Sequence, residues 1–140
     1  MKLSKETKEK YDCLAHSKTR LVYHIIFSTK YRRKALEPIF ESVLESVKYA
    51  ESKSSFKILY MNTDGDHLHL LVKCKPTFSV DQIVRRMKQF STVFLWEKQG
   101  EYLSKFYWKR HQVWTGGYFA ATVGDVSEKN VAKYIKNQGL

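Results

Sequence analysis

The chain has 140 residues, with 25 Lys and Arg against 14 Asp and Glu, which gives a formal net charge of +11. This length predicts a single domain, and a hydrophobic content of 43% excludes wholesale disorder. A positive excess of this size on a small domain predicts a polyanionic partner, of which nucleic acid is the commonest in cells.

The sequence shows no sign of export, membrane insertion or disulfide bonding. Cys13 and Cys74 lie far apart without a CxxC spacing, which excludes a cysteine-rich zinc site and fits a reducing compartment. No apolar run approaches the ~20 residues of a transmembrane helix, and the first residues lack the apolar core of a signal peptide. We therefore expect a cytoplasmic protein, associated with the nucleoid and without a membrane partner.

The first half of the chain predicts a strand, a helix and a second strand after a charged N-terminal segment. Residues 1–18 are weakly periodic and predict an arm or a short docked helix. Residues 19–28 are rich in β-branched and aromatic side chains, typical of a strand, and a basic loop follows at 30–34. From Glu37 the apolar spacing is helical, and residues 55–61 predict the second strand.

A hairpin and a long helix are predicted next. The Asp64-Gly65 turn joins the second strand to a third one at 67–74. A helix begins at Ser79, which has the form of a capping box with Gln82. Its apolar stripe consists of Ile83, Val84, Met87, Phe90, Phe94 and Leu95, and Arg85, Arg86, Lys88 and Gln89 fall on the other side.

The last predicted elements are a fourth strand and a terminal helix. Residues 113–123 predict the strand, in which Gly116-Gly117 indicates a bulge or a close backbone approach. The helix runs from about Asp125 to Gln138. The order β-α-β-β-α-β predicts an α+β, ferredoxin-like sheet with two helices on one face, followed by the terminal helix.

His67-Leu68-His69 is the first motif that indicates chemistry. Side chains at i and i+2 of a strand share a face, so two imidazoles can converge on one metal ion while Leu68 points into the core. Asp64 and Asp66 precede the pair, and carboxylates suit a hard divalent cation. The alternative is a solvated pair of histidines, with Asp66 a simple turn residue.

The terminal helix carries a polar stripe of Asn130, Tyr134 and Gln138, spaced by four residues. Val131 and Ile135 form a narrow apolar stripe beside it, so we expect the helix to dock weakly and to be able to move. The alternative is that Tyr134 is a half-buried packing residue.

Basic and aromatic residues interleave in segments 30–34, 85–88 and 105–111. Cations contact phosphates while exposed rings stack on unpaired bases, as in single-strand recognition. In the alternative interpretation, Phe106 and Trp108 belong to the core and the lysines are merely solvated. Walker and GxGxxG motifs are absent from the sequence.

Together these motifs resemble the single-tyrosine HUH transposases of the insertion-sequence 200/605 family. The resemblance runs from about residue 20 to residue 138 and combines His-hydrophobe-His on a central strand with Tyr-x-x-x-Gln on the last helix. It extends over the segments 22–27, 64–71, 87–91 and 122–124.

The resemblance implies roles for individual residues. Tyr134 would be the nucleophile, and His67, His69 and Gln138 would bind a divalent metal ion, Mg²⁺ or Mn²⁺. Asp64 corresponds to a position that joins the metal shell in some members of the family. We expect the DNA-binding residues to be Arg32, Arg33, Lys34, Arg85, Arg86 and Lys88.

The resemblance also implies an activity and partners. Members of the family are dimers whose sites are completed in trans, and they recognise a hairpin in single-stranded DNA. Cleavage leaves a 5′-phosphotyrosine and a free 3′-OH, which can later rejoin strands. Two alternatives remain open: a non-catalytic single-strand DNA or RNA binding module, which would not need Tyr134, and a replication- or relaxase-type HUH nuclease. Metal dependence separates the transposase from the first, and strand transfer between two ends separates it from the second.

Overall fold

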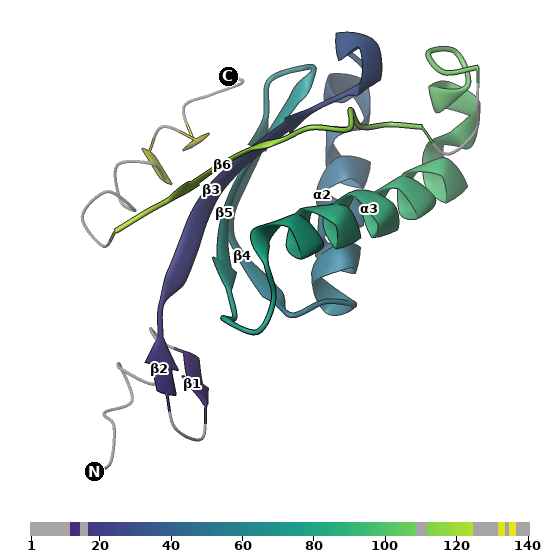
Figure 1. The fold of residues 1–140 in the computed structure, drawn as a ribbon. Coiled ribbons are helices and arrows are strands. Elements are labelled where there is room, and N and C mark those ends of the chain that lie inside the picture. The colour runs from purple at the N-terminus through teal and green to yellow at the C-terminus, as the bar shows by residue number, and fades with distance from the viewer. Residues whose placement is uncertain (1–11, 15–16, 109–111, 125–131, 134, 137–140) are drawn as a thin grey trace.

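A four-stranded antiparallel sheet with strand order β4-β5-β3-β6 forms the centre of the computed structural model (Figure 1). The structure describes residues 12–14, 17–108, 112–124, 132–133 and 135–136. The strands are β3 (Leu21–Ser28), β4 (Phe56–Thr63), β5 (His67–Cys74) and β6 (Phe119–Thr122). Two helices are inserted after β3 and after β5, so the predicted β-α-β-β-α-β order and ferredoxin-like sheet are confirmed.

Both helices cover the same face of this sheet (Figure 1). A short 3₁₀ turn, η2 (Glu37–Ile39), leads into α2 (Phe40–Ser52), and α3 (Val80–Leu103) follows β5. The capping box predicted at the start of α3 is present. The Ser79 hydroxyl accepts from the Gln82 backbone N–H at 3.1 Å, and the Gln82 side chain accepts from the Ser79 N–H at 2.9 Å.

The main core lies between the sheet and these two helices. On β5, Leu68, Leu70 and Val72 alternate with side chains of the opposite face and are fully buried toward the helices. The matching residues of α2 and α3 include Val43, Val47, Ala50, Ile83, Val84, Met87 and Leu95. Phe90 packs against this core while partly buried, in agreement with the apolar stripe predicted for α3.

Two predicted elements differ in the structure. Residues 1–18 were predicted as an arm or a short docked helix; in the described part of this segment, β1 (Asp12–Leu14) and β2 (Ser17–Thr19) pair as an antiparallel ladder. The fourth strand is shorter than 113–123, because Trp114 makes only an isolated bridge to Thr29 and regular pairing starts at Phe119.

Buried side chains and a lysine explain this shortened strand. Trp114 is turned into the core, where its indole N–H donates to the Ser91 hydroxyl at 2.9 Å. The Lys88 ammonium donates to the carbonyls of Thr115 and Gly117 at 2.7 and 2.8 Å, which fixes these carbonyls outside the ladder. A Cβ built on Gly116 or Gly117 would meet no atom within 4 Å, so the close backbone approach predicted there is wrong.

The opposite face of the sheet receives the C-terminal segment. Residues 132–133 and 135–136 are helical, as predicted, and Val131 lies outside the described residues. Ala132 and Ile135 are buried against Val22 and Leu71 and form a second, smaller apolar cluster. The Asn62 side-chain N–H donates to the Ile135 carbonyl at 2.6 Å and adds a polar contact between β4 and this segment.

Across the described part of the chain, no helix combines the length and apolar character that crossing a bilayer requires.

Candidate active site

The histidines lie on the sheet face that α2 and α3 leave open. On β5, His67 and His69 are two residues apart, and the β3–β5 register pairs His69 with Ile26. The imidazole of His24, on β3, stacks on that of His69 with ring centroids 6.1 Å apart. The rings of His67 and His69 are 6.3 Å apart, so three imidazoles follow one another across this face.

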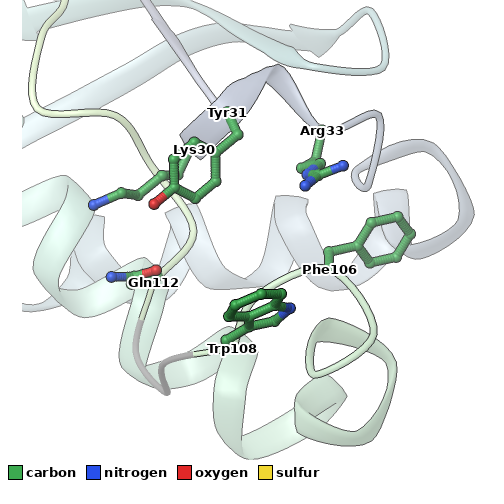
Figure 2. Close-up of a pocket in the computed structure, with 6 residues that line it drawn as sticks. All are labelled: Lys30, Tyr31, Arg33, Phe106, Trp108 and Gln112. Atoms are coloured by element: carbon green, nitrogen blue, oxygen red, sulfur yellow. The ribbon is translucent and has the colours of Figure 1, made fainter.

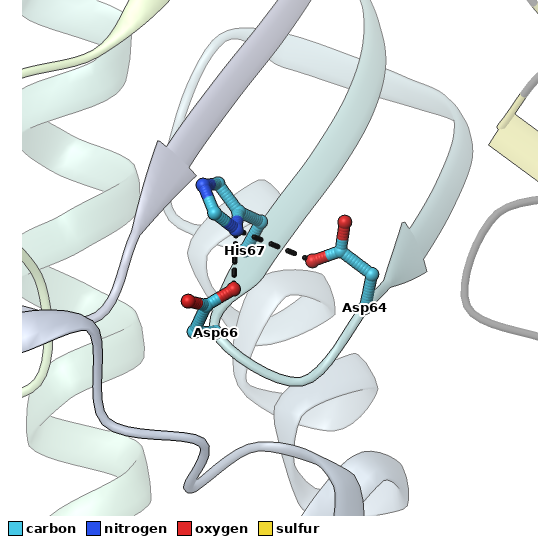
Figure 3. Close-up of side chains that lie close together, drawn as sticks. All are labelled: Asp64, Asp66 and His67. Atoms are coloured by element: carbon cyan, nitrogen blue, oxygen red, sulfur yellow. Dashed lines mark hydrogen bonds and ion pairs between the residues drawn. The ribbon is translucent and has the colours of Figure 1, made fainter.

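Asp64 connects the two predicted metal ligands. Its Oδ1 lies 3.4 Å from His67 Nδ1, and its Oδ2 lies 3.2 Å from His69 Nε2. Asp66 contacts His67 Nδ1 as well (Figure 3). Gly65 between the two aspartates has a φ of +94°, in the region that favours glycine, so the tight β4–β5 turn depends on this residue.

His69 lies at the buried end of the site, whereas His67 and Asp64 lie at the end that is open to solvent. The His69 side chain is 6% exposed, whereas those of His67 and Asp64 are 27% and 31% exposed. Burial, and to a smaller extent the neighbouring His69, lowers the pKa of His24. The His24 ring is therefore neutral at neutral pH, which keeps positive charge away from this face.

These donor atoms fit a divalent cation. Ligand atoms of Asp64, Asp66 and His67 lie within 4.8 Å of one another, and His69 joins the group through its contact with Asp64. Imidazole nitrogens with carboxylate oxygens suit Mn²⁺, and the carboxylates suit Mg²⁺. The third ligand implied by the resemblance, Gln138, lies outside the described residues and stays a prediction.

A groove of about 230 Å³ opens beside His67. Arg32 lines it together with Tyr118 and Phe119, whose side chains are 39% and 53% exposed. Arg32 was predicted to bind DNA, and the structure places it on the wall of the same groove as His67. Sequence reasoning missed the two aromatic residues, because the segment was assigned to a regular strand.

The turn that carries Arg32 is strained. In η1 (Lys30–Arg32), Tyr31 and Arg32 have φ angles of 61° and 50°, and residues other than glycine rarely adopt this left-handed region. The buried Thr29 hydroxyl donates to the Arg33 carbonyl at 2.7 Å, and its backbone N–H donates to the Asp66 carbonyl at 2.8 Å. The basic turn is thus fastened to the turn that holds the aspartates.

The other predicted DNA-binding residues have varied surroundings. Arg33 and Lys34 are exposed. Arg85 pairs with Asp81 at 2.8 Å, and Arg86 donates to the Lys53 carbonyl at 3.0 Å.

Lys88 differs from these exposed side chains, because its ammonium is engaged by the two carbonyls described above. Burial lowers the pKa of Lys88, against a smaller opposing effect of Asp81. Lys88 was predicted on the polar side of α3, and in the structure it also holds the backbone of Thr115 and Gly117 in place.

Tyr134 lies outside the described residues, but its neighbours along the chain are placed. Ala132 and Ile135 pack on the open face of the sheet. Asn62, which binds the Ile135 carbonyl, is the β4 partner of His69 in the strand register. The described part of the terminal helix therefore docks next to the strand position that carries His69.

Comparison with known proteins identifies the family. The family model described as "Transposase IS200 like" matches residues 17–138. The chain belongs to the IS200-like transposase family. It is 35% identical over 130 residues to the transposase for insertion sequence element IS200 of Salmonella typhimurium, across 89% of this chain and 81% of that protein. The ISDra2 transposase TnpA of Deinococcus radiodurans is 22% identical over 120 residues, across 85% of this chain and 84% of that protein.

Solved structures agree with this IS200-like transposase in fold. A Deinococcus radiodurans R1 protein assigned as a transposase superposes with a TM-score of 0.72 at 21% identity, across 91% of this chain and 97% of that one. A REP-associated tyrosine transposase, solved bound to a REP hairpin, superposes with a TM-score of 0.61 at 10% identity, across 88% and 70% of the two chains.

Proposed function

We propose that this IS200-like transposase cleaves and rejoins single-stranded DNA in a metal-dependent reaction, with Tyr134 as the nucleophile. One observation carries the proposal. Asp64 contacts both His67 and His69 on the sheet face where the residues on either side of Tyr134 dock. The candidate metal ligands and the described residues near Tyr134 in the sequence therefore lie on one face of the sheet, and the main core lies on the other.

The proposed chemistry is a transesterification. The Tyr134 phenol oxygen attacks the scissile phosphorus, the bond from phosphorus to the 3′ oxygen breaks, and the phenol proton is transferred, in net terms, to that oxygen. A 5′-phosphotyrosine and a 3′-OH result, and attack by a 3′-OH reverses the step without an external energy source. A divalent ion, when bound, would stabilise the negative charge that develops on the phosphoryl oxygens.

Individual residues of this chain have separate tasks in this scheme. His67, His69 and Asp64 hold the metal ion, with Gln138 as a further ligand. Arg32, on the wall of the adjacent groove, neutralises the phosphate of the strand that enters it. Imidazole and amide ligands add no negative charge to a metal site, so Asp64 would be the anionic member of this set and a bound divalent ion would keep a net positive charge, which favours binding of the anionic substrate.

We also propose that the substrate carries a hairpin. The net charge of +11 and the exposed Arg33 and Lys34 support a nucleic-acid partner. The relative solved with a REP hairpin supports a hairpin as the recognised element. Arg85, Arg86 and Lys88 belong to the same proposal, although Lys88 is partly engaged by backbone carbonyls.

A covalent-capture assay tests the mechanism. The protein is incubated with labelled single-stranded DNA from the sequence flanking its own coding region, with Mg²⁺ or Mn²⁺, and run on a denaturing gel. We expect a protein–DNA adduct that needs the metal and disappears with Tyr134→Phe and with His67→Ala, but persists with the control Tyr49→Phe on α2. An adduct with Tyr134→Phe would refute the assignment of the nucleophile, and one in EDTA would refute the metal requirement. Hairpin binding without any adduct would favour the non-catalytic module.

The proposal includes a homodimer with sites completed in trans. Mixing Tyr134→Phe with His67→Ala tests it, because each variant retains the half of the site that the other lacks. We expect the mixture to recover adduct formation, which neither variant has alone. If the mixture stays inactive although co-purification through two different affinity tags shows mixed dimers, each site is completed within one chain.

A further inference from the structure

We propose that a second cavity, formed by η1 and the segment that follows α3, binds an unpaired nucleobase of the single-stranded DNA substrate. It has a volume of about 360 Å³ and is lined by Lys30, Tyr31, Arg33, Phe106, Trp108 and Gln112 (Figure 2). We refer to it as the aromatic cavity. The inference rests on the proposed function, in that it takes single-stranded DNA to be the substrate.

Exposed aromatic rings are the first argument for this ligand. Trp108 is 100% exposed and Tyr31 is 68% exposed, whereas Trp96 and Trp114 are 8% and 7% exposed. The predicted exposed ring is therefore confirmed for Trp108, whereas Phe106 is partly buried against the main core, as in the alternative interpretation. Single exposed aromatic residues are common, but Tyr31 and Trp108 line the same cavity, and exposed apolar groups gathered at one place indicate an interaction site. Every nucleobase offers a flat face on which such rings can stack.

Charge is the second argument. Lys30 and Arg33 flank Tyr31 on the η1 side of the aromatic cavity, opposite Trp108 (Figure 2). None of the described lining residues is acidic. The Lys30 ammonium lies 5.7 Å from the centre of the Tyr31 ring, so a cation is held next to a stacking surface. The Gln112 amide adds a donor and an acceptor that a base edge can use. Rings, cations and an amide together match a base with its phosphate.

The strained turn supplies the third argument, because it divides its side chains between two sites. Arg32 lines the groove beside His67, whereas the residues on either side of it, Tyr31 and Arg33, line the aromatic cavity. The Thr29 N–H binds the Asp66 carbonyl, which ties this turn to the metal-binding turn. Because neighbouring residues of one turn line both sites, we infer that the bound strand runs from the His67 groove past Arg32 to the aromatic cavity.

Tryptophan fluorescence provides a direct test. The chain has three tryptophans, of which Trp96 and Trp114 are buried. A dissolved quencher such as iodide, or a stacked base, therefore lowers the fluorescence emission of Trp108. The probes are the single strand of oligo(dT) and a blunt DNA hairpin whose loop is replaced by an ethylene-glycol linker, so that this hairpin contains no unpaired base. We expect oligo(dT), and not the blunt hairpin, to quench the emission at saturation and to protect Trp108 from iodide.

The affinities of variants for oligo(dT) measure how much individual side chains of the cavity contribute to binding. Trp108→Ala should weaken oligo(dT) binding about 5- to 150-fold, the range that loss of one stacked base gives, while Trp108→Phe keeps most of the affinity and loses the signal. Lys30→Gln should weaken binding and reduce its salt dependence. The matched control is Lys48→Gln, which removes the same charge from an exposed position on α2 and should bind as the wild type does.

Two results would overturn the inference: an unchanged affinity of Trp108→Ala for oligo(dT), or equal quenching by the blunt hairpin. The adduct assay on the wild-type protein reports on the proposed function separately. If Trp108 is quenched by oligo(dT) but no adduct forms, the cavity stands and the catalytic proposal fails. If an adduct forms and Trp108→Ala binds normally, the reverse holds.

Discussion

Replacing Ile135 by alanine should release the terminal helix without unfolding the rest of the protein. Ile135 is fully buried and, of the described residues of the helix, contributes the larger side chain to the small cluster with Val22 and Leu71, the other being Ala132. Ile135→Ala removes three carbon atoms, worth about 0.8 kcal/mol each when buried, or about 2.4 kcal/mol in all. Measured costs of such changes are about 2–5 kcal/mol, and the low end applies because a docked helix can settle into the space.

Hydrogen exchange followed by mass spectrometry gives the assay. A loss of about 2 kcal/mol raises the open population of the helix about 30-fold, so the peptide that spans residues 132–136 should exchange about 30-fold faster. Amides of α2 and the central strands should keep their protection, because their core lies on the other side of the sheet.

The control for this experiment is Ile83→Ala, which removes the same atoms from the main core. It should lower the free energy of unfolding of the whole domain in urea. The reasoning is refuted if Ile135→Ala leaves exchange of the 132–136 peptide unchanged, or if it speeds exchange of α2 as much as Ile83→Ala does. The first result would mean that Ile135 does not stabilise the docked helix, and the second that the terminal helix is part of the main cooperative unit.

Further predictions concern the loop, the cap, alkaline pH and the metal. Lys88→Gln should lower the free energy of unfolding by about 1.5–3 kcal/mol in urea titrations, because it removes charged hydrogen bonds to two carbonyls, whereas Lys48→Gln should change it little. Ser79→Ala should lower it by about 1 kcal/mol through loss of the α3 cap, and Ser79→Asp should restore it. Burial raises the pKa of Tyr107 above its usual 10.0, so the unfolded chain releases this proton first and stability falls as pH rises through about 10. Tyr107→Phe should flatten this decline in urea titrations at pH 9 to 11, and an unchanged slope would contradict it. Asp64→Ala should weaken Mn²⁺ binding in calorimetry, which an exposed control, Glu45→Ala, should leave intact.

Local sequence signals were sufficient for most of the fold. Alternation of apolar residues predicted β5 to the residue, and the Ser79 and Gln82 pair predicted the start of α3. Residues 113–118 were wrongly predicted as part of a strand. A composition rich in β-forming residues occurs both in strands and in loops that distant side chains hold in place, so composition does not separate the two. The Lys88 contacts that hold this loop join positions 27 and 29 residues apart, and no local pattern contains them.

The candidate site was predictable in part. His-x-His on a strand placed His67 and His69 on one face from spacing alone, and the structure adds the Asp64 contact to both. The contribution of Arg32 to the same groove depends on the left-handed turn at Tyr31 and Arg32, which contains no glycine to signal it. The exposure of Trp108 could not be separated from burial by sequence, because the two alternatives differ only in how the segment after α3 is folded.

One face of the sheet packs against the helices and the other carries the histidines, and this division has a consequence for cells that contain both active and substituted copies of the protein. Substitutions at His67 or Asp64 remove groups that contribute nothing to the main core, so such copies remain folded. Under the proposed function, such copies would keep the basic surface that binds the DNA ends while lacking the metal site. Inactive copies that accumulate in a cell would then compete with active ones for the same DNA ends and act as dominant-negative inhibitors of transposition.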